Sequence, residues 1–152
     1  MKKEIDLFFE YSLWELLSNE FRQEKHITER FLSIIQNKNC AVFISNECAE
    51  KTNTWGEPAK EQFKRMVGKL KPIIIVPTQE INELSEEYNK YNLFPSEKNI
   101  LCKEIASASV NNIPAIVTID QDLIKYRTKI KIKGINQLLG YHPLEIISPE
   151  EL

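Results

Sequence analysis

Short apolar segments alternate along this chain with segments whose apolar residues recur at helical spacing. The apolar segments are continuous rather than alternating, which indicates strands that are covered on both faces of a sheet. Strands that alternate with helices are typical of a parallel sheet. The sequence therefore predicts an α/β fold, a three-layer sandwich in which helices cover both faces of a five-stranded, mostly parallel sheet. The expected strands are residues 5–9, 40–45, 73–76, 115–119 and 144–147.

The segments between these strands predict about six helices. Thr78 is expected to cap a helix that runs to about Tyr91, and Ser96 is expected to cap the helix over residues 100–110. The region from Tyr126 to Pro143 is longer than a simple link between a helix and a strand, and we expect it to be irregular. The other helices are expected over residues 11–17, 27–36 and 58–70.

The composition is that of an ordinary soluble globular protein, with 42% hydrophobic and 28% charged residues. No linker, repeat or low-complexity tract interrupts the 152 residues, so we expect a single domain over residues 1–152. The net charge of −2 gives no overall attraction for nucleic acid, so any such contact has to come from a local patch. The longest apolar runs, about five residues, are too short for a membrane span.

Cysteine and histidine give little support to a zinc site or a catalytic triad. The three cysteines lack metal-finger spacing, and the two histidines, His26 and His142, lie far apart in the sequence. Cys40 and Cys102 fall inside an expected strand and an expected helix, so we expect buried thiols. This pattern suits a reducing cytoplasm.

Two acidic residues, Glu10 and Asp120, each follow an expected strand directly. The carboxyl ends of parallel strands are where ligands and catalytic groups gather, so both side chains are expected at one edge of the sheet. Asp120 has a second interpretation, because an aspartate in this position often caps the following helix. Asp122 follows closely and is either a supporting acid or part of a turn.

The order of these segments resembles a PIN domain, the nuclease fold of many toxin–antitoxin ribonucleases, over nearly the whole chain. The closest stretch is PAIVTIDQDL at residues 114–123, which is similar to the family's apolar-Val-Thr-x-Asp-x-Asp/Asn segment. FFEYSL at residues 8–13 is similar to its apolar-Asp-Thr-Asn/Ser-apolar segment. The remaining similarity lies in residues 42–50, in Phe94-Pro95, in residues 104–110 and in residues 145–152.

The resemblance implies three or four carboxylates around one or two Mg²⁺ or Mn²⁺ ions, which prefer oxygen ligands and promote phosphodiester hydrolysis. Asp120 matches one acidic position, and Glu10 matches another as a glutamate in place of the usual aspartate. The second acid of the family falls on Lys51, or on Glu50 if one residue is skipped.

The third acid of the family falls on Leu101, with Glu104 one helical turn later. The expected catalytic residues are therefore Glu10, Glu50, Glu104 and Asp120, and the expected metal ligands are Glu10, Asp120 and Asp122. The hydroxyl of Ser12 is expected to hold a phosphate or a water molecule, or else to cap the first helix.

Lysines also alternate with apolar residues from Thr128 to Lys133. In an extended segment this period places Lys129, Lys131 and Lys133 on one face, where they could bind the RNA backbone without reading its sequence. The alternative is a charged edge strand that discourages aggregation.

These patterns favour a metal-dependent endoribonuclease of PIN type, which the resemblance implies is the toxin of a toxin–antitoxin pair. RNA, an antitoxin protein and a second copy in a homodimer are the expected partners. The alternative keeps the fold without catalysis, as a module that binds RNA or protein, because Leu101 and Lys51 stand at usual acidic positions. A Rossmann-like nucleotide-binding domain is a weaker alternative, since four glycines give no Gly-x-Gly-x-x-Gly pattern.

Overall fold

The computed structural model, which describes residues 5–19 and 25–152, contains one five-stranded sheet with the order β3-β2-β1-β4-β5. All four strand pairs are parallel, which confirms and sharpens the expected α/β architecture. The strands are β1 (Ile5–Phe9), β2 (Cys40–Ser45), β3 (Ile73–Ile75), β4 (Ala115–Val117) and β5 (Glu145–Ile147).

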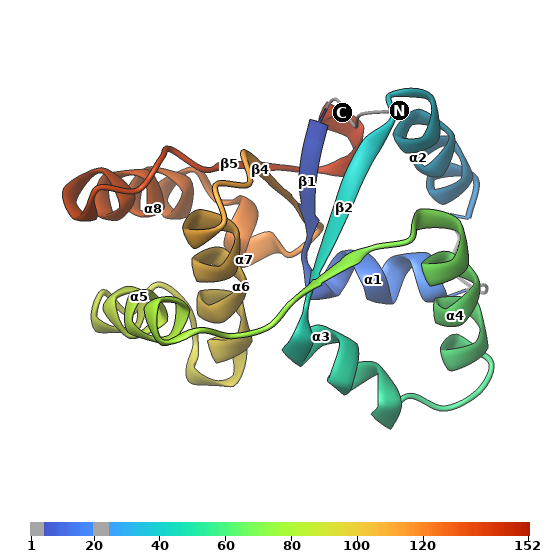
Figure 1. The fold of residues 1–152 in the computed structure, drawn as a ribbon, viewed down its shortest axis with the longest axis horizontal. Coiled ribbons are helices and arrows are strands. Elements are labelled where there is room, and N and C mark those ends of the chain that lie inside the picture. The colour runs from blue at the N-terminus through green and yellow to red at the C-terminus, as the bar shows by residue number, and fades with distance from the viewer. Residues whose placement is uncertain (1–4, 20–24) are drawn as a thin grey trace.

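Helices cover both faces of this sheet (Figure 1). The α-helices of the described residues are α1 (Tyr11–Ser18), α2 (Lys25–Asn37), α3 (Asn46–Lys51), α4 (Ala59–Leu70), α5 (Gln79–Lys90), α6 (Asn99–Val110), α7 (Gln121–Ile124) and α8 (Tyr126–Leu139). Short 3-10 helices are η1 (Thr52–Thr54), η2 (Ser96–Lys98) and η3 (Pro149–Glu151). None of the helices described is long and apolar enough to cross a membrane.

The central strand β1 shows why the protein has two hydrophobic cores. Successive side chains of a strand point to opposite faces, so Leu7 and Phe9 enter one core and Phe8 enters the other. The first core lies against α1, α2 and α4, and the second against α5, α6 and α8. Phe8 and Phe9 are fully buried, and each such side chain stabilises a fold by about 1.5–3 kcal/mol relative to an exposed one.

The largest difference from the sequence prediction is α8. Residues 126–139 form a regular helix instead of an irregular connection, and the segment with alternating lysines is not extended. Its buried positions, Thr128, Ile132, Ile135 and Asn136, recur at spacings of three and four residues. The buried face therefore follows the helical period, and the alternation over residues 128–133 is carried partly by Ile130, which is exposed.

A smaller difference concerns the start of α6. The Thr78 side chain accepts a hydrogen bond from the Ile81 N–H at 3.2 Å and caps α5 as predicted. Ser96 does not cap α6, because it begins the 3-10 helix η2 instead. This extra turn places Lys98 directly before α6, from where its side chain reaches Asp120 and Asp122.

Candidate functional site

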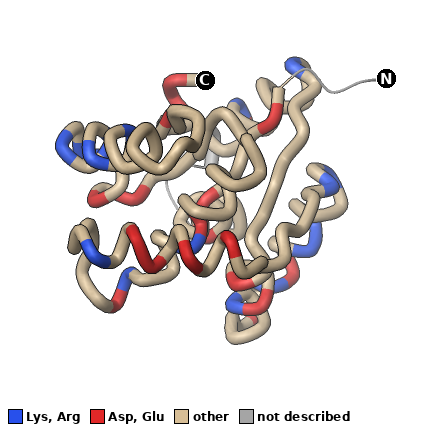
Figure 2. The backbone as a smooth tube through the Cα atoms, turned by 60° about the vertical axis from the view of Figure 1, so that its left-hand side comes forward, with Lys and Arg blue, Asp and Glu red and all other residues tan. Residues whose placement is uncertain are grey.

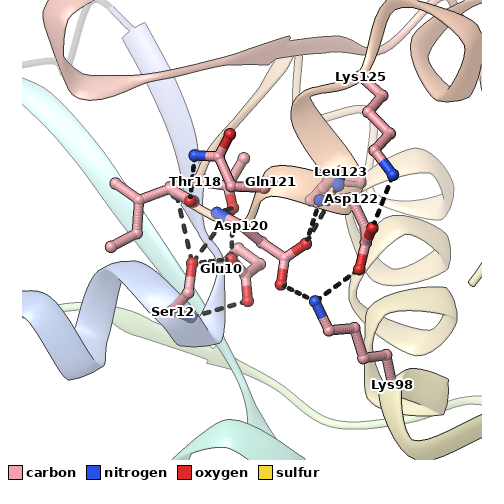
Figure 3. A network of polar contacts seen from close by, with 10 residues as sticks. Glu10, Ser12, Lys98, Thr118, Asp120, Gln121, Asp122, Leu123 and Lys125 are labelled. Atoms are coloured by element: carbon pink, nitrogen blue, oxygen red, sulfur yellow. Dashed lines mark hydrogen bonds and ion pairs between the residues drawn. The ribbon is translucent and has the colours of Figure 1, made fainter. Parts of the chain in front are cut away.

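The parallel strands bring the polar residues that follow them to one edge of the sheet, as predicted. Phe9 at the end of β1 lies beside Val117 at the end of β4. The backbone N–H of Glu10 donates to the Val117 carbonyl at 3.0 Å, so Glu10 lies next to Thr118. Figure 3 shows Glu10, Thr118 and Asp120 close together at this edge.

Glu10 is buried and its carboxylate is surrounded by hydrogen-bond donors. It accepts hydrogen bonds from the Ser12 backbone N–H at 2.7 Å and from the hydroxyls of Ser12 and Thr118. The bond to the Ser12 N–H makes Glu10 itself the N-cap of α1, so Ser12 is not the cap. Burial raises the pKa of Glu10, while these hydrogen bonds oppose the rise and the Asp120 charge adds to it.

Thr118 links the two halves of this network. Its hydroxyl donates to Glu10 and accepts a hydrogen bond from the Asp120 backbone N–H at 2.9 Å. Ser12 adds a second connection, because its hydroxyl accepts from the Ile119 N–H at 3.3 Å. The orientations of Glu10 and of the segment that carries Asp120 are therefore fixed by the same two hydroxyl groups.

Glu104 reaches the same edge from α6. One of its oxygens, Oε2, accepts a hydrogen bond from the Tyr11 N–H at 3.2 Å. The other, Oε1, is buried and meets no hydrogen-bond donor among the described residues. Burial raises the pKa of Glu104 well above its usual range, and the charges of Glu10 and Glu47 raise it further.

Asp120 caps the following helix, which is one of the two roles that the sequence left open. Its Oδ1 accepts hydrogen bonds from the backbone N–H groups of Asp122 (2.9 Å) and Leu123 (3.1 Å), which makes it the N-cap of α7. Its Oδ2 accepts a hydrogen bond from Lys98 Nζ at 2.9 Å. The same ammonium lies 2.7 Å from Asp122 Oδ2 and therefore bridges the two aspartates.

Asp122 is also paired with Lys125, whose Nζ lies 3.1 Å from Asp122 Oδ1. Hydrogen bonds from Lys98 and Lys125 lower the pKa of Asp122, so this carboxylate stays ionised. The hydrogen bonds to Asp122 and Asp120 in turn raise the pKa of Lys98, so its ammonium stays charged.

Glu50 is a predicted site residue that does not join this group. It is exposed on α3 and accepts a hydrogen bond from Asn46 of the same helix at 3.1 Å. Glu47 lies on the side of α3 that faces α6, since its Oε1 is 3.8 Å from Lys103 Nζ and its charge acts on Glu104. Glu47 was missed because the sequence gives no means of choosing between two acids of one short helix.

Leu101 and Lys51, the two departures from the family pattern, have different surroundings. Leu101 is buried in the core beneath α5 and α6, where it contributes no ligand. The Lys51 ammonium lies 4.5 Å from the centre of the Tyr11 ring, a cation–π distance, and its charge slightly lowers the pKa of Glu104. Lys51 is exposed and therefore lies at the margin of the site.

The predicted RNA-binding lysines lie along α8. This helix leads from the carboxyl edge of β4 back to the start of β5, so its positions differ in distance from the site. Lys133 Nζ pairs with Glu145, the first residue of β5, at 3.1 Å. Lys133 therefore lies at the amino ends of the parallel strands, opposite to the site. In Figure 2, basic positions lie together along the helix at the upper left, and acidic positions predominate on the helix below it.

The acidic group is partly suited to a divalent cation. Its donors are carboxylate oxygens, and the unpaired Oε1 of Glu104 is a buried acceptor that lacks a partner among the described residues. Within residues 5–19 and 25–152, however, no three acidic, histidine or cysteine side chains are already arranged around a metal position. Asp120 Oδ2, the oxygen that does not cap α7, already pairs with the Lys98 ammonium. The residue types fit the metal, and Lys98 opposes it on one side.

The strand order and the acid-bearing edge define a PIN-like fold, which confirms the resemblance drawn from the sequence. The chain is similar to a chain in the crystal structure of VapBC2 from Rickettsia felis bound to a DNA fragment from their promoter. That similarity has a TM-score of 0.60 and 12% sequence identity, and it covers 95% of this chain and 98% of the other. No protein-family model matches the sequence, and no curated protein does.

Proposed function

We propose that this protein is a metal-dependent endoribonuclease of PIN type. The observation that carries the proposal is that acids from three distant segments lie near one sheet edge, where the Asp120 charge acts on the buried Glu10 and the Glu10 charge acts on the buried Glu104. Buried carboxylates that repel one another cost stability, and a bound cation would relieve this cost. Acid clusters with strongly shifted pKa values are typical of functional sites.

Each residue has a distinct part in the proposed reaction. Glu10 and Glu104 would hold the cation, and Asp120 and Asp122 would support them from beside it. A bound Mg²⁺ or Mn²⁺ would supply the positive charge that activates water and stabilises the leaving oxygen of a phosphodiester. Ser12 and Thr118 keep the Glu10 carboxylate oriented through their hydroxyl groups.

Lys129 and Lys131 remain candidates for contact with the RNA backbone, and neutralising them should weaken binding without changing sequence preference. We further infer an antitoxin partner and a homodimer, in a cytoplasmic toxin–antitoxin pair. The support is the likeness of the fold to a chain of the VapBC2 complex, together with three buried cysteines that suit a reducing compartment.

The test of this function is cleavage of a mixed pool of cellular RNA with Mg²⁺ or Mn²⁺. Glu10→Gln should lower the cleavage rate by at least about 100-fold, and Asp120→Asn by about 10–100-fold, the cost of changes behind metal ligands. Glu86→Gln, the same chemical change at an exposed position on α5, is the matched control and should cleave like the native chain. Cleavage that survives both site variants would contradict the proposal.

A second candidate function is a non-catalytic module that binds RNA or protein. The observation that favours it is that Lys98 already pairs with Asp120, while Leu101 supplies no ligand. In that case RNA binding, followed by gel shift at several salt concentrations, should persist in EDTA without any cleavage. Glu10→Gln should then leave binding unchanged.

A further inference from the structure

The acids of the site fall into two halves with different electrostatic surroundings. Asp120 and Asp122 form one half and share the Lys98 ammonium at 2.9 and 2.7 Å, as Figure 3 shows. Glu10 and Glu104 form the other half. In the described part of the chain, their recorded hydrogen bonds come only from neutral groups, namely the hydroxyls of Ser12 and Thr118 and two backbone N–H groups.

Lys98 is placed in the first half by the backbone. It ends the 3-10 helix η2, directly before α6, and its side chain crosses to the start of α7. Asp120 has only one oxygen to offer, since Oδ1 is used by the backbone N–H groups at the start of α7. Lys98 takes the other oxygen. A divalent ion could bridge the two aspartates only if the ammonium left.

We propose that Lys98 is a resident cation that fills the position between Asp120 and Asp122, so that any divalent ion bound by the native chain lies on the Glu10–Glu104 half. An ammonium supplies one charge and three donors, which two aspartate oxygens at these distances satisfy well. Together with Lys125, which pairs with Asp122, Lys98 balances the charges of the two aspartates. The inference deepens the proposed function, because it assigns the divalent ion to one side of the same site.

The experiment counts bound Mn²⁺ per chain from the loss of the electron paramagnetic resonance signal of the free ion. Lys98→Met keeps the length of the side chain and removes its charge, so the count should rise by one ion. Adding Asp122→Asn to this variant should abolish the gain, because the bridging carboxylate is then lost. An unchanged count in Lys98→Met, or a gain that survives the second change, would overturn the proposal.

Two further variants separate this effect from general changes in charge or folding. Lys125→Met removes a lysine that pairs with Asp122 alone and should leave the count unchanged. Asp122→Asn in the native chain tests the inference even if Lys98→Met does not fold. This variant should retain the native Mn²⁺ count, and loss of the ion would contradict the assignment to the Glu10–Glu104 half.

The failure of this inference can be told apart from failure of the proposed function. A native chain that binds no Mn²⁺ and cleaves no RNA would refute the proposed nuclease. A gain of one ion in Lys98→Met would still show that the lysine fills a cation position.

Discussion

At the scale of single residues, Glu104 is the group whose surroundings fit its chemistry least well. It is 1% exposed, one of its oxygens has no hydrogen-bond partner among the described residues, and two other acids act on it. A buried carboxylate of this kind destabilises the folded chain whenever it is ionised. Under the proposed function, a bound cation would offset this cost.

This environment predicts that Glu104→Gln stabilises the protein at neutral pH. Burial raises the folded-state pKa of Glu104, so the folded chain keeps a proton that the unfolded chain releases above about pH 4.3. Stability therefore falls as the pH rises between the unfolded and folded pKa values. The free energy of unfolding in urea with EDTA should be higher for the variant at pH 7.5, and the two proteins should converge below pH 4. A variant less stable than the native chain at pH 7.5 would contradict this account.

Removing the hydroxyl of Thr118 is expected to destabilise the protein through the loss of hydrogen bonds. Thr118→Val keeps the shape of a fully buried side chain and removes the hydroxyl that serves Glu10 and the Asp120 N–H. Leaving buried polar groups unpaired costs about 1–3 kcal/mol, and chemical denaturation should show a decrease of this size. Thr118→Ser, which keeps the hydroxyl, should lose less. A Thr118→Val variant as stable as the native chain would contradict this role of the hydroxyl.

At the scale of elements, α8 is attached to the domain by a buried polar residue. Asn136 donates to Ser109 at 2.9 Å and to the His142 carbonyl at 3.2 Å, and it accepts a hydrogen bond from Tyr88. Burial raises the pKa of this tyrosine to about 12, so its hydroxyl remains a donor. These contacts join α8 to α5, to α6 and to the segment between α8 and β5.

Asn136→Leu is therefore expected to destabilise the protein, although leucine has a similar size. The substitution leaves the Tyr88 hydroxyl and the His142 carbonyl without their partner, at a cost of about 1–3 kcal/mol. Thermal unfolding monitored by circular dichroism would show the lower midpoint. Adding Tyr88→Phe should recover part of the loss, because one unpaired group is removed. An unchanged midpoint in Asn136→Leu would refute this role.

The elements also show where sequence reasoning succeeded. The five strands were predicted because each is a short apolar run between turn-forming residues, and a parallel sheet leaves such runs no polar face. The helix α8 was missed because six residues with period two, from Thr128 to Lys133, masked a longer helical period that only Ile135 and Asn136 complete.

At the scale of the whole molecule, parallel topology alone was sufficient to predict that Glu10 and Asp120 would meet. Lys98 could not be predicted, because its partner lies 22 residues away and depends on the extra turn of η2. Glu104 was proposed from the family pattern, whereas its unpaired oxygen follows from packing that no spacing records. The sequence thus indicated Glu10, Glu104 and Asp120 correctly as neighbours, while Glu50 lies apart from them and the pairing of Asp120 with Lys98 follows only from the structure.

The packing of both cores predicts that the three thiols are unreactive in the native protein. Cys40, Cys48 and Cys102 are each at most 6% exposed, and burial raises the pKa of Cys102 to about 11. The reactive thiolate is therefore scarce at pH 8, and an aromatic disulfide reagent should label none of them within minutes. In guanidinium chloride it should label three per chain. Since Cys48 and Cys102 lie in different cores, rapid labelling of either one would show that its own helical layer opens independently of the other.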